Sequence, residues 1–265
     1  MTRTHGKFVW YELLTTDPDA AARFYGAVLG WTMHGAANSP NDYRQFAAAG
    51  IDVAGLMALP AGAPMPPVWL GYIGVDDIDA SVAAITGAGG SIQMPVTAVP
   101  GIGRFALVAD PQGGMVYVMQ PVGDGESTSF STDLTGRCSW NELSTTDQRG
   151  ALAFYQGQFG WTQGDAMDMG PMGEYRFINH DGGGIGAVTP CPPDGPPTMW
   201  TYYFRVPDID AAAARVTAAG GSIAHGPSEV PGDDHIIIGI DPQGASFALV
   251  GKRGAAWAPH RLNCR

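Results

Sequence analysis

The sequence has few cysteines, no signal-peptide core and no long apolar run, and each shortage excludes a class of protein. Its three cysteines, Cys138, Cys191 and Cys264, are far apart and odd in number, so they predict neither a disulfide framework nor a CxxC metal site. Apolar stretches fall far short of the roughly 20 residues that span a bilayer. The first five residues contain no apolar segment typical of a secretion signal. We therefore expect a cytoplasmic protein.

Basic residues are also scarce. Lysine and arginine number 14 against 25 aspartates and glutamates, which gives a net charge of −11. An acidic surface repels phosphate backbones and anionic lipids, so we expect neither a nucleic acid nor a membrane as partner. In contrast, 45% of the residues are apolar and 10% are aromatic, enough for sizeable cores. A length of 265 residues suggests about two domains.

An internal repeat gives the domain organisation. Residues 6–17 return as residues 136–147 with seven of twelve positions identical. Further blocks recur in the same order: FY and GW near residues 24–31 and 154–161, DIDA at 77–80 and 208–211, AGGSI at 88–92 and 219–223, and DPQG at 110–113 and 241–244. Such ordered blocks indicate a duplicated domain. We predict one domain over residues 1–120, a linker over 121–135, a second domain over 136–253 and a tail over 254–265.

Each half is itself predicted to be doubled. A strand-like run at residues 8–14 leads into a helix start at Asp17-Pro18, and Ala21, Phe24, Tyr25 and Val28 then recur with helical spacing until Gly30. Residues 68–75 and the helix carrying Ile78, Val82 and Ile85 repeat that order. Strand-like runs follow each helix. The pattern predicts an α+β fold with a βαβββ unit used four times.

The motif TTDxxxAxxFYxxxxGW, with DPQG before the last strand of each half, resembles the vicinal oxygen chelate superfamily, which contains glyoxalases, bleomycin-resistance proteins and extradiol dioxygenases. The resemblance covers nearly the whole chain except the linker and the residues after Lys252. It looks closest to two-domain actinobacterial proteins labelled glyoxalase-like proteins or hydroxylases. It implies two tandem glyoxalase-like domains, each with paired units that form a curved mixed sheet around a cavity.

The superfamily's usual chemistry needs a divalent metal held by three strand positions of each cavity. Matching these positions to the motif of each half gives no competent set of ligands. His180 and His235 have no histidine counterpart in the first half, and no HxH or HExxH spacing occurs. We therefore expect no metal and no other cofactor. In the first half, the three mapped positions fall at Trp10, at or next to Leu70, and at Tyr117. In the second half, they fall at Trp140, at or next to Thr201, and at Ala248.

Glu12 and Glu142 lie two residues beyond the repeated tryptophans, on the same strand face under period-2 alternation. A glutamate within an apolar strand must be paired, protonated or solvated, because burying a bare charge costs several kcal/mol. One interpretation is a structural hydrogen-bond acceptor, which the presence of the residue in both copies favours. The other is a general acid or base with a raised pKa in an apolar pocket.

Other candidates occupy matching places in the two halves. His235 is a candidate acid–base group near neutral pH, and Arg104, at the equivalent position, is a candidate contact for an anion or phenolate, although a solvated strand end explains both. The paired tryptophans either pack in a core or line cavities suited to flat aromatic ligands. The predicted ligand-binding residues are Trp10, Trp69, Arg104, Tyr117, Trp140, Trp200 and Tyr202.

These features favour a metal-independent protein that acts on or binds a small aromatic or polyketide-like molecule, through isomerase, cyclase or hydroxylase-type chemistry. One alternative is a non-catalytic protein that sequesters a drug, as bleomycin-resistance relatives do. A second is a metal-dependent lyase or dioxygenase with atypical ligands, and a third is a scaffold with vestigial cavities. A monomer or a homodimer fits each hypothesis. The sequence identifies neither the substrate nor which half of the chain would bind it.

Overall fold

The computed structural model describes residues 4–35, 42–60, 62–63, 65–123, 125–191 and 197–254, so the tail predicted over 254–265 lies almost wholly outside the described residues. The first half contains eight strands and two helices. Their bounds are β1 Phe8–Thr15, α1 Pro18–Leu29, β2 Thr32–Gly35, β3 Arg44–Ala48, β4 Ile51–Ala58, β5 Val68–Gly74, α2 Ile78–Gly87, β6 Ser91–Val99, β7 Gly103–Ala109 and β8 Met115–Pro121.

The second half repeats this order, with one extra 3₁₀ turn. Its elements are β9 Cys138–Thr145, α3 Gln148–Phe159, β10 Thr162–Asp168, η1 Gly170–Met172, β11 Glu174–His180, β12 Gly183–Pro190, β13 Met199–Arg205, α4 Ile209–Ala218, β14 Ser222–Val230, β15 Asp234–Ile240 and β16 Ser246–Lys252.

Each half forms one eight-stranded mixed sheet. The strand order is β2-β3-β4-β1-β5-β8-β7-β6 in the first half and β10-β11-β12-β9-β13-β16-β15-β14 in the second. The first strands of the two units, β1 and β5, pair antiparallel, as do β9 and β13. The sheets are open, with edge strands at both ends, so neither closes into a barrel. The predicted α+β class and the four βαβββ units are confirmed.

Local sequence explains where the helices begin and which face they bury. The side chain of the aspartate before each α-helix accepts a hydrogen bond from a backbone N–H of the first turn. Gly30 and Gly160 end α1 and α3 with positive φ angles of 72° and 70°, which glycine adopts without strain. The predicted apolar faces of α1 and α2 are the buried ones. Strand β2 is an edge strand whose four residues are exposed.

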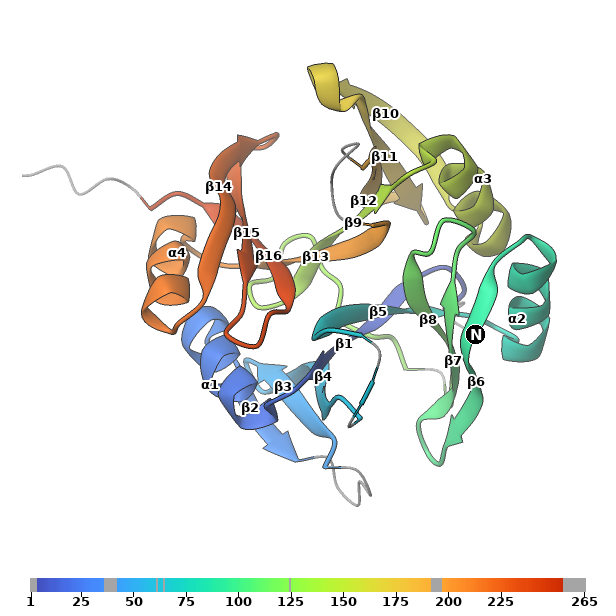
Figure 1. The fold of residues 1–265 in the computed structure, drawn as a ribbon, viewed down its shortest axis with the longest axis horizontal. Coiled ribbons are helices and arrows are strands. Elements are labelled where there is room, and N and C mark those ends of the chain that lie inside the picture. The colour runs from blue at the N-terminus through green and yellow to red at the C-terminus, as the bar shows by residue number, and fades with distance from the viewer. Residues whose placement is uncertain are drawn as a thin grey trace, which may run out of the picture.

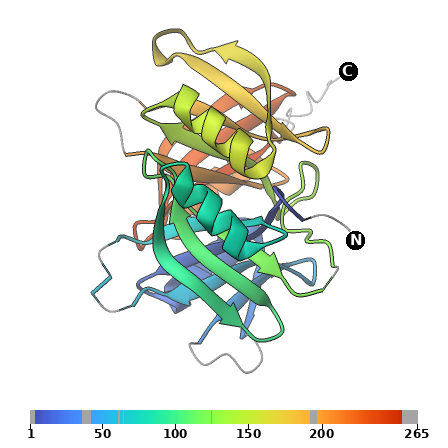
Figure 2. The same ribbon diagram turned by 90° about the vertical axis from the view of Figure 1, so that its right-hand side faces the viewer.

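One apolar core joins the two halves. It contains buried residues of all four α-helices and of both sheets. Figure 1 shows α1 beside α4 and α2 beside α3, and Figure 2 shows the second of these helix pairs from its exposed side. The helices therefore pack where the halves meet, and no described α-helix covers the opposite face of either sheet.

Candidate functional site

The two faces of each sheet have different roles. Along β1, Tyr11 and Leu13 belong to the core shared by the halves, whereas Trp10 and Leu14 belong to a separate apolar cluster that contains no helix residue. The second half has a matching small cluster around Tyr203, Ala248 and Val250, against which Trp140 packs. We call these surfaces the helix-free faces. Under strand alternation, Glu12 and Glu142 point to them together with Trp10 and Trp140.

On the first helix-free face, Glu12 lies among tyrosines. Its carboxylate accepts hydrogen bonds from the hydroxyls of Tyr43 and Tyr72. The Nε1 of Trp10 donates to the Tyr43 hydroxyl at 2.9 Å. The ring of Tyr117 stacks on Tyr72 with centroids 4.2 Å apart. Glu12 is 3% exposed, so its carboxylate is enclosed by the side chains of its own half.

The second half repeats this arrangement. The hydroxyls of Tyr175 and Tyr203 donate to the same oxygen of Glu142, at 2.8 Å and 3.0 Å. The Nε1 of Trp140 donates to the Tyr175 hydroxyl at 2.7 Å. In contrast to Glu12, Glu142 is partly exposed. Each half therefore carries a tryptophan, a glutamate and two tyrosines in one hydrogen-bonded set, which we call the Glu–Tyr cluster.

Burial dominates the electrostatics of both clusters. It disfavours the ionised carboxylate and raises the pKa of Glu12 from 4.5 to about 7, although the hydrogen bonds from Tyr72 and Tyr43 oppose this rise. The pKa of Glu142 is also raised by burial, against the hydrogen bonds from Tyr175 and Tyr203. A carboxyl group with a pKa near neutrality can both accept and return a proton, which is the property that general acid–base chemistry requires.

Three aromatic residues predicted to bind ligand lie on the other face of the sheet. The Nε1 of Trp69 donates to the Tyr25 hydroxyl at 2.8 Å, and that of Trp200 donates to the Tyr155 hydroxyl at 3.1 Å. Tyr202 is 1% exposed and accepts a hydrogen bond from the backbone N–H of Gly71. All three belong to the core between the halves. This corrects their expected placement in a cavity, because each is one strand position out of phase with the Glu–Tyr cluster.

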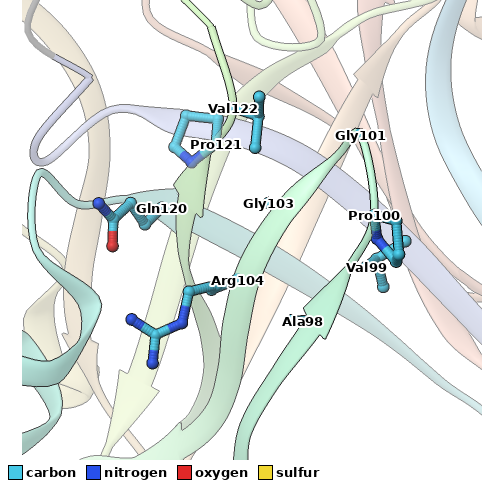
Figure 3. A pocket seen from close by; sticks show the side chains of 9 residues that line it. All are labelled: Ala98, Val99, Pro100, Gly101, Gly103, Arg104, Gln120, Pro121 and Val122. Atoms are coloured by element: carbon cyan, nitrogen blue, oxygen red, sulfur yellow. The ribbon is translucent and has the colours of Figure 1, made fainter.

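Arg104 and His235 also face away from the helix-free surfaces. Their neighbours Phe105 and Ile236 pack against those surfaces, so alternation directs Arg104 and His235 to the helix side. The guanidinium of Arg104 pairs with Asp79 of α2 at 2.7 and 2.8 Å. It lines a hollow of about 300 Å³ at the end of the β6–β7 hairpin, where Figure 3 shows its side chain beside Gln120. The Nδ1 of His235 is buried without a partner among the described residues.

The tyrosines of the clusters were not among the predicted site residues. They are Tyr43 and Tyr72 in the first half and Tyr175 and Tyr203 in the second. A signal for them was present, because all four recur at equivalent positions of the repeat. Tyr203 directly follows Tyr202, and alternation places the two side chains on opposite faces of strand β13. In the structure Tyr203 contacts Glu142, and Tyr202 packs between the halves.

A second hollow, of about 380 Å³, lies where the halves meet near the N-terminus. The amino group of Lys7 lies there between the carboxylates of Glu126 and Asp181, at 3.8 and 3.4 Å. All three side chains are at least 40% exposed, so these ion pairs stabilise the fold little. No predicted site residue lines this hollow.

Comparison with protein families identifies the fold group. The model of the Glyoxalase/Bleomycin resistance protein/Dioxygenase superfamily matches residues 7–118 and again residues 137–249. The chain belongs to this superfamily. The two matches coincide with the two eight-stranded sheets, so each half is one superfamily domain. The resemblance inferred from the sequence motifs is confirmed.

Relatives cover nearly the whole chain. The "Putative glyoxylase CFP32" of Mycobacterium tuberculosis is 35% identical over 91% of this chain and 93% of its own length. The "Anthracycline biosynthesis protein DauV" of a Streptomyces species is 30% identical over 96% of this chain and 97% of its own. Among solved structures, the Mn(II)-bound glyoxalase from Novosphingobium aromaticivorans has a TM-score of 0.64 at 21% identity, covering 95% of this chain and 83% of its own. The similarity to the Novosphingobium glyoxalase concerns the fold alone.

The donor atoms present do not match a metal site of the superfamily's usual form. The mapped positions Trp10, Leu70 and Tyr117 do share one helix-free face, because all three belong to or pack against the same cluster. They supply no imidazole or carboxylate, and among the described residues Glu12 is the carboxylate that lies beside Leu70. Among the described residues, no three histidine, cysteine or acidic side chains gather closely enough to hold a metal ion. In the same residues, no helix is long and apolar enough to cross a membrane.

Proposed function

We propose that the protein acts on a small aromatic or polyketide-like molecule without a metal, using a Glu–Tyr cluster for acid–base chemistry. The observation that carries the proposal is the repeated set in which a glutamate with a raised pKa is held by two tyrosine hydroxyls beside a tryptophan. Two relatives named for anthracycline biosynthesis support an aromatic polyketide as ligand, since their names refer to that chemistry.

The chemistry follows from the protonation of the glutamate. As a carboxylate, it accepts a proton from a carbon next to a carbonyl or from a phenol of the bound molecule. The carboxyl group then returns that proton to another atom of the same molecule, so an isomerisation or cyclisation balances without a further reactant. The tyrosine hydroxyls hold the carboxylate in one orientation, and the indole provides an apolar wall for a flat ring.

The first experiment concerns metal. We expect elemental analysis of the purified protein to find no stoichiometric zinc, iron, nickel or manganese, and we expect binding of an aromatic ligand to be unchanged after treatment with a chelator. About one metal ion per half, lost on the exchange Glu12→Gln or Glu142→Gln, would contradict the proposal and favour the metal-dependent alternative.

The second experiment concerns turnover. A hydroxylated anthraquinone is titrated into the protein while the tryptophan fluorescence is followed, and candidate polyketide substrates are incubated with chelator-treated protein and analysed by mass spectrometry. Binding with turnover supports the proposal. Binding without turnover of any candidate favours the sequestering alternative. If no aromatic compound binds, the proposed substrate class is wrong.

A further inference from the structure

The two helix-free faces differ at several equivalent positions around the Glu–Tyr clusters, which are themselves the same. Strand register and backbone hydrogen bonds define the equivalence; for example, Glu12 pairs with Leu70 where Glu142 pairs with Thr201. Leu59 and Cys191 likewise make the same backbone bond, to Thr15 and Thr145. At five positions a large apolar residue of the first half is replaced by a small hydroxyl or thiol, and at the sixth a tyrosine is replaced by alanine. The pairs are Leu14/Ser144, Met57/Thr189, Leu59/Cys191, Leu70/Thr201, Met115/Ser246 and Tyr117/Ala248.

These exchanges close one face and open the other. In the first half Leu70 is 2% exposed and Tyr117 is 4% exposed, and both pack over the buried Glu12. In the second half Thr201 and Glu142 are both partly exposed. The smaller side chains remove volume that fills the first face, and Glu142 is accordingly less buried than Glu12, although Ala248 itself is fully buried.

The second helix-free face presents hydroxyl groups for which the described residues supply no partner. In the part of the chain that the structure describes, the side-chain hydroxyls of Thr189, Thr201 and Ser246 make no hydrogen bond. The hydroxyl of Ser144 donates to the sulfur of Cys191 at 3.3 Å. Ser144 pairs with Thr189 on the neighbouring strand, so the polar groups lie side by side next to Glu142.

Apolar walls flank this polar strip. Trp140 and Phe177 meet edge to face with ring centroids 5.9 Å apart, and Ile236 and Ile238 pack against Tyr203 from the other side. A planar ring system suits such walls, and hydroxyl or keto oxygens on its edge suit the free threonine and serine hydroxyls.

We propose that the second half alone binds the ligand, and that the strip formed by Ser144, Thr189, Thr201 and Ser246 recognises oxygen substituents on an aromatic ring system. The first half then has a structural role, because large apolar side chains fill its helix-free face. This proposal rests on the proposed function, since it places the aromatic ligand at one of the two Glu–Tyr clusters.

The first test transfers first-half residues into the second half. Two variants, Thr201→Leu and Ala248→Tyr, are titrated with a hydroxylated anthraquinone beside the wild type, and their melting temperatures are measured. We expect one ligand per chain and an affinity loss of at least about tenfold in each variant, because each adds side-chain volume to the face that carries Glu142. The matched exchange in the first half, Leu70→Thr, is expected to change affinity less than about twofold.

The second test needs no substitution. Cys191 is partly exposed at the edge of the polar strip, whereas Cys138 is 1% exposed. The native protein is alkylated with iodoacetamide with and without the anthraquinone, and the modified peptides are separated by mass spectrometry, which distinguishes Cys191 from Cys138 and Cys264. We expect bound ligand to slow alkylation of Cys191 at least about tenfold.

The outcomes separate this inference from the proposed function. Two ligands per chain, unaltered alkylation of Cys191 on binding, or loss of binding in Leu70→Thr with full binding in both second-half variants would overturn the inference and leave the proposed function standing. Failure of the wild type to bind any aromatic compound would overturn both. If a second-half variant fails to fold, the stoichiometry of ligand binding to the wild type and the alkylation rate of Cys191 test the inference instead.

Discussion

At the residue scale, the same glutamate lies in two different surroundings. Glu12 and Glu142 each accept hydrogen bonds from two tyrosines, yet Glu12 is enclosed and Glu142 is partly exposed. The prediction from sequence left a structural and a catalytic interpretation open. The filled face around Glu12 supports the structural interpretation there, while the open face around Glu142 makes that residue the better candidate for proton transfer.

The raised pKa of Glu12 makes a pH-dependent prediction. Because the folded protein holds the proton up to about pH 7 whereas the unfolded chain releases it near 4.5, the free energy of unfolding falls as pH rises between these values. The expected loss is of the order of 3 kcal/mol, from about 1.4 kcal/mol per pH unit of pKa shift. The variant Glu12→Gln cannot ionise and should lose less stability over this range.

Urea denaturation of both proteins at pH 5 and pH 8 measures the effect. We expect the variant to gain stability relative to the wild type as pH rises. Parallel stability curves would show that Glu12 does not titrate in this range.

At the element scale, helices α1 and α3 are fastened to the opposite half by the same motif residues. The Tyr25 hydroxyl of α1 donates to Asp241 at 3.1 Å, and the Tyr155 hydroxyl of α3 donates to Asp110 at 3.0 Å. The tryptophans that follow these helices donate to the backbone of the other half, Trp31 to Gly136 and Trp161 to Gly6. The FY, GW and DPQG blocks of the repeat therefore maintain contact between the halves.

These hydrogen bonds predict how much the free energy of unfolding falls when one tyrosine hydroxyl is removed. The exchange Tyr25→Phe leaves the indole N–H of Trp69 without its acceptor and removes one donor from the buried Asp241. Unpaired buried groups cost about 1–3 kcal/mol, so we expect a loss of that size in the free energy of unfolding.

The exchange Tyr155→Phe is the matched control, because it breaks the reciprocal set with Trp200 and Asp110. Urea denaturation should give similar losses for both variants. A loss in one and none in the other would contradict the symmetric role that the contacts indicate.

At the scale of the whole molecule, the two halves share one core. Phe24 of α1 stacks edge to face on Phe247 of the second half with centroids 5.5 Å apart, and Trp69 meets Phe204 at 4.9 Å. A half produced alone would expose this apolar surface to water, at a cost of about 25 cal/mol for each Å².

We therefore expect residues 4–123 and residues 125–254, expressed separately, to unfold, aggregate or pair with a second copy. Mixing the two pieces should restore a compact complex of the size of the full chain. Size-exclusion chromatography with light scattering checks both outcomes. A stable monomer formed by either piece alone would contradict a shared core.

Several features of the protein could be read from the order of its residues. The repeat defined two equivalent halves, the aspartate and glycine positions marked the ends of helices α1 and α3, and the spacing of Ala21, Phe24, Tyr25 and Val28 gave the buried face of α1. The residues at the mapped ligand positions showed that the usual metal donors are missing. These features depend on local backbone chemistry or on sequence identity alone, so no tertiary contact is needed to establish them.

The tertiary structure decided which aromatic residues share a face with each glutamate. Alternation along a strand separates two faces but does not say which of them packs against helices, and here both faces carry aromatic residues. A register shift between Phe8 and Trp10 also places Phe8 in the shared core, on the opposite face from Trp10. Only the pairing of β5 with β1 and of β13 with β9, and the docking of one half on the other, placed Tyr72 and Tyr203 beside the glutamates and Tyr202 between the halves. Contacts between distant segments set these positions, because the same aromatic side chain can pack on either side of a sheet.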